Sequence, residues 1–135
     1  MEERYKATLI LHALGDTIGF KNGQWEFNFG HESINANMAL EILYDFISLG
    51  GINHLNTKDW IVSDDTVLHM ATAKSLLHEH EDLSKLGNIL SKEYIEAFNN
   101  MKDRYPGEST EKYLNKLKKG NSWDETPYDE NSGGS

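Results

Sequence analysis

Apolar residues recur with the 3.6-residue period of an α-helix in several segments of the chain. The clearest segment covers residues 34–49, and the glycine pair Gly50-Gly51 that follows it is typical of a helix C-terminus. The same period predicts further helices over residues 5–14, 63–78, 83–101 and 109–117. No alternation of period two lasts long enough to predict a strand, and no internal repeat is found. The pattern therefore predicts an all-α fold.

Breaks in the apolar pattern set the expected organisation. The first helix should end near Leu14, with Asp16 between helix and loop, because three glycines follow: Gly15, Gly19 and Gly23. Residues 52–60 are expected to form a loop. Apolar residues become rare towards the C-terminus, so we expect residues 1–118 to form the helical part and residues 119–135 to be a loop or a disordered tail.

The helical segments carry more apolar surface than one small bundle requires. The chain has 135 residues, the length of one domain, and 38% of them are hydrophobic, which is low for a well-buried core. Helix faces that find no apolar partner within a chain mark places where other elements pack. We therefore expect part of this surface to be exposed, as in a fragment of a larger helical domain.

Charge and cysteine content restrict the function. Thirteen basic residues stand against 22 acidic ones, and the net charge of −9 argues against nonspecific binding to nucleic acid. A phosphate-bearing ligand would then need backbone N–H donors or a bridging cation. Without cysteine, the sequence offers no disulfide and no thiolate zinc site. It shows neither a basic signal-peptide start nor an apolar run of membrane-spanning length, so a cytoplasmic location is expected.

Hydroxyl and carboxylate side chains gather in Ser63-Asp64-Asp65-Thr66, at the expected start of a helix. Oxygen ligands of this kind suit a hard cation such as Mg²⁺, which takes a few carboxylates and keeps several waters. The same residues also suit a plain helix N-terminus, because serine is a good N-cap and the helix dipole favours aspartate in the first turn. From these residues alone, both interpretations stay open.

Histidines offer a second candidate metal site. His69 follows Asp65 by four residues, which places both on one face of the predicted helix. His78 and His80 lie at the end of the same helix, where cationic side chains suit the dipole. No third ligand stands at a spacing characteristic of zinc, so a zinc site is disfavoured.

An ordered series of motifs gives the strongest indication of function. Residues 11–20 are followed by Gly23-Gln24-Trp25-Glu26-Phe27, Val62-Ser63-Asp64-Asp65-Thr66, Ala71-Thr72-Ala73, Arg104-Tyr105-Pro106-Gly107 and Asn131-Ser132-Gly133-Gly134-Ser135. This series resembles the ADP-ribosylglycohydrolase family, and most closely its ADP-ribosylarginine hydrolase branch. The resemblance implies a compact orthogonal helical bundle, of which this chain would be the N-terminal portion. It also implies a Mg²⁺-dependent hydrolase that removes ADP-ribose from modified arginine side chains.

The resemblance assigns roles to individual residues. Ser63, Asp64 and Asp65 would be metal ligands in a site that holds two Mg²⁺ ions in the complete family fold, and the two carboxylates would also be catalytic. Glu26 would position or deprotonate the attacking water, although without the resemblance it reads as a solvated loop acid. Gly133 and Gly134 would begin a loop whose N–H groups contact the phosphate or ribose of ADP-ribose, although such glycines are equally typical of a flexible tail.

One part of the family pattern is not found. Family members complete the site with a second acidic cluster, Asp-x-Asp followed by Ser or Thr, and this sequence contains none. Two functions therefore stay open: an ADP-ribosylarginine hydrolase, or a non-catalytic protein that binds ADP-ribose or a protein partner. In a third arrangement, a second polypeptide would supply the missing helices and ligands. The expected ligand is an ADP-ribosylated protein or ADP-ribose, with neither nucleic acid nor membrane as partner.

Overall fold

The computed structural model of the chain describes residues 2–25 and 36–125. Within these ranges the chain forms six α-helices and two 3₁₀ turns but no β-strand, which confirms the predicted all-α fold. In chain order the elements are α1 (Glu2–Phe20), η1 (Lys21–Gly23), α2 (Ala36–Ser48), α3 (Gly51–His54), α4 (Asp64–Leu77), α5 (Leu83–Phe98), α6 (Glu108–Lys118) and η2 (Trp123–Glu125).

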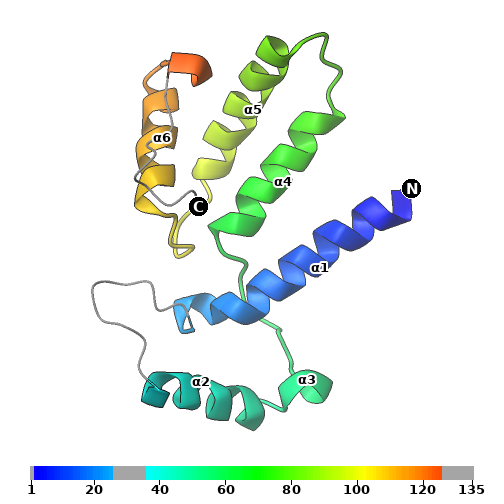
Figure 1. Ribbon diagram of the computed structural model, residues 1–135, viewed down its shortest axis with the longest axis vertical. Helices are drawn as coiled ribbons and strands as arrows, with labels where there is room; N and C mark the ends of the chain where they lie inside the picture. Colours follow the sequence, from blue (N-terminus) through cyan, green and yellow to red (C-terminus); the bar gives the residue numbers. More distant parts are fainter. Residues whose placement is uncertain (1, 26–35, 126–135) are drawn as a thin grey trace.

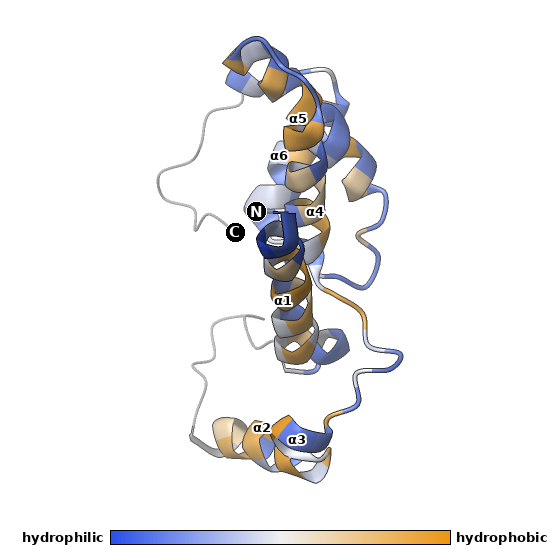
Figure 2. Ribbon diagram, turned by 90° about the vertical axis from the view of Figure 1, so that its right-hand side faces the viewer, coloured by the Kyte–Doolittle hydropathy of each residue, from blue (hydrophilic) through white to orange (hydrophobic). Residues whose placement is uncertain are grey.

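The helices fall into two groups. Helices α4, α5 and α6 lie side by side in one layer, and α1 packs against α4 (Figure 1). Helices α2 and α3 contact each other and lie at the far end of the molecule, beyond the C-terminal end of α1 (Figures 1 and 2). Within the first group, the last turns of α1 and the first turn of α4 are joined by hydrogen bonds. The second group is joined to the end of α1 through Asp45 of α2, which pairs with Lys21 and accepts a hydrogen bond from Trp25.

Helix α1 is longer than its sequence predicts. It does not end near Leu14 but continues through two glycines to Phe20. A glycine inside a helix costs about 1 kcal/mol relative to alanine. Tertiary contacts offset this cost, since Phe20 is buried and its ring lies 5.9 Å from that of Tyr105. The helix ends where Lys21 and Asn22 take left-handed backbone conformations, with φ values of 41° and 55°.

The other helix termini follow local chemistry. The hydroxyl of Ser63 accepts a hydrogen bond from the backbone N–H of Asp65 at 3.2 Å and caps α4, as predicted. The carboxylate of Asp82 caps α5 in the same way, through the N–H of Lys85 at 2.8 Å. Beyond α2, Gly50 takes a φ of 103°, which glycine adopts without strain. The expected loop over residues 52–60 includes most of the short helix α3.

The buried apolar core is small. Among the described residues it consists of Phe20, Ala71, Met101, Leu114 and Leu117. These side chains come from the end of α1, from α4 and α6, and from the loop after α5. Helices α2 and α3 contribute none of them, so this part of the chain is held mainly by polar and aromatic contacts near η1.

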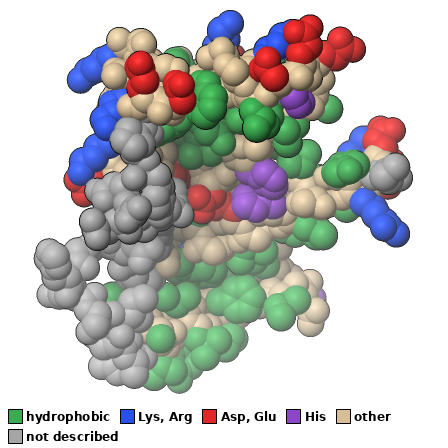
Figure 3. All heavy atoms as spheres, turned by 45° about the horizontal axis from the view of Figure 1, so that its top comes forward, with side chains coloured by type: hydrophobic (Ala, Val, Ile, Leu, Met, Phe, Trp, Pro, Cys, Tyr) green, Lys and Arg blue, Asp and Glu red, His purple; other side chains and the backbone are tan. Residues whose placement is uncertain are grey.

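An exposed apolar stripe runs along α2. Its members have the helical spacing i, i+3, i+4 and i+7 and exposed fractions between 47% and 67%: Leu40, Leu43, Tyr44 and Ile47. Ile52 of α3 is 90% exposed, and α1 exposes Ile10, Leu11 and Leu14. Figure 3 shows hydrophobic side chains gathered over the end of the molecule that holds α2 and α3. The expectation of exposed apolar surface is therefore confirmed.

The segment that begins at residue 119 is described as far as residue 125. Trp123 of η2 lies against α5 at Gly87, where an added Cβ would stand 2.4 Å from the indole ring. The rest of the predicted tail, residues 126–135, lies outside the described residues. No described helix combines the length and the apolar character that a membrane span requires.

Candidate functional site

The acidic cluster lies at the first turn of α4. Ser63, Asp64 and Thr66 are buried, with exposed fractions of 5%, 8% and 5%, whereas Asp65 is exposed. Ser63 is the N-cap, so the capping interpretation of this motif is correct for its hydroxyl. The carboxylates of Asp64 and Asp65 follow this cap directly, in the first turn of α4. Because successive helical residues point about 100° apart, Asp64 and Asp65 face different directions.

Asp16 holds this turn from the α1 side. One oxygen of its carboxylate, Oδ2, accepts hydrogen bonds from the backbone N–H of Ser63 at 2.9 Å and from the hydroxyl of Thr66 at 2.5 Å. Hydrogen bonds to a charged acceptor are stronger than neutral ones, and this carboxylate is only partly exposed. Asp16 lies within α1 rather than after it, and it acts as a support for the acidic cluster.

Arg104 holds the same turn from the opposite side. Its guanidinium donates to the backbone carbonyl of Val62 and, through Nε, to that of Asn100 at 2.9 Å. Its own carbonyl accepts the N–H of Asp64 at 3.2 Å. The backbone that leads into α4 is therefore fixed between α1 and the loop after α5. Spacing and composition gave no sign of this role, because Arg104 lies 42 residues from Val62 in the chain.

The η1 turn connects the segment before Glu26 with the segment before Ser63. The side chain of Asn22 accepts the backbone N–H of Ile61 at 2.7 Å. Gly23, with a φ of 80°, lies so close to the ring of Tyr105 that an added Cβ would stand 2.5 Å from it. Three loops thus meet at one place, formed by residues 21–25, 56–63 and 99–107.

A polar and aromatic cluster surrounds Lys21. Its ammonium forms an ion pair with Asp45 of α2 and lies 4.7 Å from the ring centre of Trp25. The indole N–H of Trp25 donates to Asp45 Oδ2 at 3.0 Å. The ring centres of Trp25 and Trp60 are 5.9 Å apart, and the two ring planes meet at 82°. The bonds from Lys21 and Trp25 hold the pKa of Asp45 below its usual value. No sequence pattern indicated this cluster, because its members come from three separate segments of the chain.

Asp64 and Asp65 provide the kind of oxygen donors that Mg²⁺ accepts. Within the described ranges, no three His, Asp or Glu side chains stand close enough to hold a metal together. Mg²⁺ is usually bound through only one or two carboxylates, with waters and substrate phosphates as further ligands. The donor set therefore fits Mg²⁺ in a site that is completed by ligand oxygens or by further protein groups.

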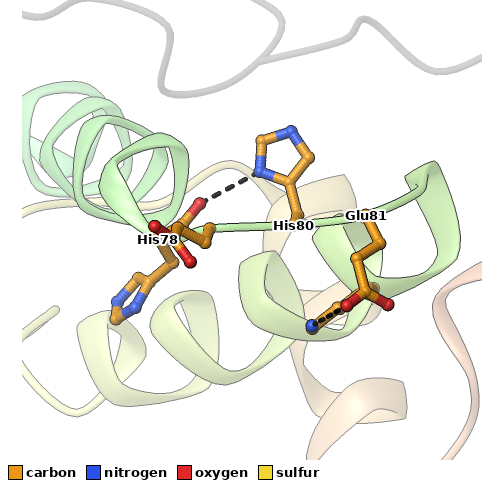
Figure 4. Close-up of a pocket in the computed structure, with 5 residues that line it drawn as sticks. His78, His80 and Glu81 are labelled. Carbon is orange, nitrogen blue, oxygen red and sulfur yellow. Dashed lines mark hydrogen bonds and ion pairs between the residues drawn. The ribbon is translucent and has the colours of Figure 1, made fainter.

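Among residues 2–25 and 36–125, no histidine belongs to a group that could hold a metal. His69 packs edge-on against His12 of α1, with ring centres 4.3 Å apart. At the end of α4, Figure 4 shows the rings of His78 and His80 pointing in different directions, with Nδ1 of His80 bonded to the carbonyl of His78 at 3.0 Å. Nε2 of His78 is 3.9 Å from Glu93. His12, His69, His78 and His80 thus make pairwise contacts.

Three predicted site residues cannot be placed. Glu26, Gly133 and Gly134 lie outside the described residues, so their roles stay predictions. Among the predicted ligands, Ser63, Asp64 and Asp65 are placed together by α4, and Asp16 and Arg104 support them.

Comparison with known proteins gives the family. A sequence model of the ADP-ribosylglycohydrolase family matches residues 1–135. A protein of Acanthamoeba polyphaga mimivirus, named as an ADP-ribosyl glycohydrolase, is 34% identical over 125 residues, which is 89% of this chain and 24% of the relative. ADP-ribosylhydrolase ARH1 of Dictyostelium discoideum is 37% identical over 112 residues, which is 81% of this chain and 26% of the relative. The chain thus spans about a quarter of the length of these relatives. By its sequence and its helical fold, the chain belongs to the ADP-ribosylglycohydrolase family.

Proposed function

We propose that this chain is part of a Mg²⁺-dependent hydrolase that removes ADP-ribose from modified arginine side chains. The observation that carries the proposal is the first turn of α4, where Asp64 and Asp65 stand on a backbone held by Asp16 on one side and Arg104 on the other. Ligands on a rigid, well-supported element keep their geometry better than ligands on an unsupported loop. Membership of the ADP-ribosylglycohydrolase family supports the same reaction class.

The reaction breaks the bond between the anomeric carbon of ribose and a guanidinium nitrogen. Such a bond breaks through a cation-like sugar, so the site has to hold the ribose, direct a water to the anomeric carbon and assist the departing group. Glu26 is proposed to orient that water or to take its proton. The N–H groups of Gly133 and Gly134 are proposed to contact the phosphate or ribose oxygens.

Ser63, Asp64 and Asp65 are proposed to hold Mg²⁺, with two ions in the complete site. When bound, Mg²⁺ supplies positive charge that orients ribose and phosphate oxygens and makes a nearby water more acidic. Asp65 is exposed and accessible to an ion, whereas Asp64 is buried. The hydroxyl of Ser63 already accepts the N–H of Asp65, and one of its lone pairs is free for a further contact.

The rest of the site is proposed to come from further polypeptide. The sequence contains no Asp-x-Asp motif that could serve as the second acidic cluster. The relatives are about four times as long as the matched segment. The apolar stripe of α2 and the exposed apolar residues of α1 are suitable surfaces for additional helices. Such helices, on this chain or on a second one, would carry the distal metal ligands.

A second candidate function is binding without catalysis. In that case the chain would hold ADP-ribose weakly, or a protein partner through the apolar stripe of α2. The exposed apolar side chains and the single acidic cluster favour this alternative for the 135 residues acting alone.

Release of ADP-ribose from an ADP-ribosylarginine peptide separates the two functions. The purified chain is assayed with Mg²⁺ and with a chelator, alone and together with the part of the Dictyostelium relative that lies outside the matched segment. Chelator-sensitive release in either mixture supports the hydrolase. Binding of ADP-ribose without release in both mixtures supports the second function. Neither binding nor release from a folded chain contradicts the hydrolase and the binding of ADP-ribose.

A further inference from the structure

The ammonium group of Lys21 occupies a cage formed by Trp25, Trp60 and Asp45, which we name the cation cage. The two indole rings stand nearly perpendicular, at 82°, and form two walls of a corner. Lys21 Nζ lies 4.7 Å from the ring centre of Trp25 and 6.0 Å from that of Trp60, within the range of cation–π attraction. The carboxylate of Asp45 closes the third side by pairing with the same ammonium.

Lys21 is held in the cage against backbone strain. Its side chain is only 13% exposed, so most of it is desolvated among the cage residues. The φ values of Lys21 and Asn22 are positive, a conformation that costs about 1–2 kcal/mol for a residue with a Cβ. Contacts in the cage and at Asn22 oppose this strain. A competing cation that satisfied the cage would allow the turn to relax.

The chemistry of the cage suits a guanidinium better than an ammonium. A planar guanidinium can stack on one indole while it donates two parallel N–H bonds to a carboxylate. The bonds from Lys21 and Trp25 both fall on Oδ2 of Asp45, and the Asp45 side chain is still 41% exposed. An ammonium acts as a point charge and uses this arrangement only in part.

The cage is adjacent in the chain to both parts of the candidate site. Trp25 directly precedes Glu26, and Trp60 stands three residues before Ser63. The bond between Asn22 and the N–H of Ile61 ties these two segments together. A ligand bound in the cage would therefore be close to the segments that carry the proposed catalytic residues.

We propose that the cation cage binds the guanidinium of the arginine side chain, and that Lys21 occupies the cage when substrate is absent. The assignment of arginine as the natural occupant rests on the proposed function. Binding of a guanidinium by the cage does not, because it follows from the two indoles and the carboxylate alone.

The test uses ethylguanidinium as the ligand and its neutral isostere ethylurea as the control, with tryptophan fluorescence and calorimetric titration as readouts. Lys21→Gly removes the competing side chain and suits the left-handed backbone at this position. This variant should bind ethylguanidinium with a Kd at least ~10-fold below that of the wild type, because it lacks the internal competitor. Ethylurea should show no saturable binding to either protein.

Two further variants locate the binding. Asp45→Asn and Trp60→Leu, each combined with Lys21→Gly, should abolish saturation by ethylguanidinium, whereas Lys58→Gly in the wild-type background should behave as the wild type. Lys21→Ala is the second variant if Lys21→Gly loses its helical circular dichroism. Absence of saturable binding to a folded Lys21 variant overturns the cage, as does equal binding of ethylurea. These titrations need no hydrolysis, so their failure is distinct from failure of the hydrolase proposal.

Discussion

The carboxylate of Asp16 on α1 accepts a hydrogen bond from the hydroxyl of Thr66 on α4, 50 residues further along the chain. The same oxygen also accepts the backbone N–H of Ser63. A side chain from another helix thus satisfies one of the N–H groups near the start of α4 and orients the turn that carries Asp64 and Asp65. The geometry of the candidate metal site depends on this contact between helices.

Removing either partner of this contact should destabilise the chain. We expect Asp16→Asn and Thr66→Val each to lower the free energy of unfolding by about 1–2 kcal/mol, since each breaks a partly buried hydrogen bond that involves a charged group. The double variant should lose less than the sum of the two, by about 1 kcal/mol, because the two residues share one bond. Urea unfolding followed by circular dichroism measures all three values.

Thr8→Val is the matched control for this cycle. The hydroxyl of Thr8 bonds only within α1, to the carbonyl of Arg4, and is exposed. Its loss should change the free energy of unfolding by less than about 0.5 kcal/mol. Strict additivity of Asp16→Asn and Thr66→Val would show that the two side chains do not interact in solution.

The carboxylates of the first turn should determine the affinity for Mg²⁺. Asp64→Asn and Asp65→Asn keep the size of each side chain but remove its charge, so each should raise the Kd for Mg²⁺ by at least ~10-fold, the smallest loss typical even of an outer-shell partner. Asp59→Asn is the control, because Asp59 is an exposed acid in the loop that precedes α4 and lies outside the proposed site. Isothermal titration checks the values, and an unchanged Mg²⁺ affinity of the double variant Asp64→Asn/Asp65→Asn would contradict the metal proposal.

The sequence predicted those elements whose cause is local. Helix α4 begins where Ser63 predicts, because the cap is a bond between residues two positions apart. Helix α2 ends before Gly50 for an equally local reason, the positive φ that glycine supplies there. The order of motifs identified the family, since it needs no knowledge of contacts.

The sequence did not reveal features that depend on long-range contacts. Helix α1 passes through two glycines because its last turns pack on residues more than 40 positions away, and local propensity contains no trace of those partners. Arg104 was noted in the sequence only as part of a family motif. The motif did not reveal its bond to the carbonyl of Val62, which holds the backbone that leads into α4. The cage around Lys21 joins segments near residues 21, 45 and 60, and no periodicity brings them together.

Replacement by alanine should have opposite effects on the free energy of unfolding at Gly19 and at Gly23. Gly23→Ala should lower the free energy of unfolding by about 2 kcal/mol or more, because its φ is 80° and an added Cβ would stand 2.5 Å from the ring of Tyr105. Gly19→Ala should raise it by about 0.5–1 kcal/mol, because Gly19 lies inside α1 with no atom near the added Cβ. Thermal unfolding of the two variants compares them directly, and stabilisation by both would mean that the η1 turn is not formed as described.

The ion pair between Asp45 and Lys21 should weaken at acid pH. The bonds from Lys21 and Trp25 hold the pKa of Asp45 below its usual value of 3.8. Because this pKa is lowered, the contribution of the ionised Asp45 to stability is fully present above about pH 4. It is lost as the pH falls through the pKa of Asp45 in the folded state. The difference in stability between the wild type and Asp45→Asn should therefore be constant from pH 7 to pH 5 and shrink below pH 4. Glu41→Gln, an exposed acid on the same helix, is the control. A difference that grows on acidification would contradict the ion pair.

The apolar stripe of α2 should contribute to association rather than to the stability of the chain. Leu43 is 49% exposed, so Leu43→Gln should change the free energy of unfolding by less than about 0.5 kcal/mol. Leu114 is 1% exposed, and Leu114→Ala should lower it by about 2–5 kcal/mol because it leaves a cavity in the core. Sedimentation equilibrium should show weaker self-association, or weaker binding of the complementary part of the relative, for Leu43→Gln alone. If Leu43→Gln instead destabilises the isolated chain as strongly as Leu114→Ala, the stripe is packed within the chain itself, and the proposal that further helices cover it is wrong.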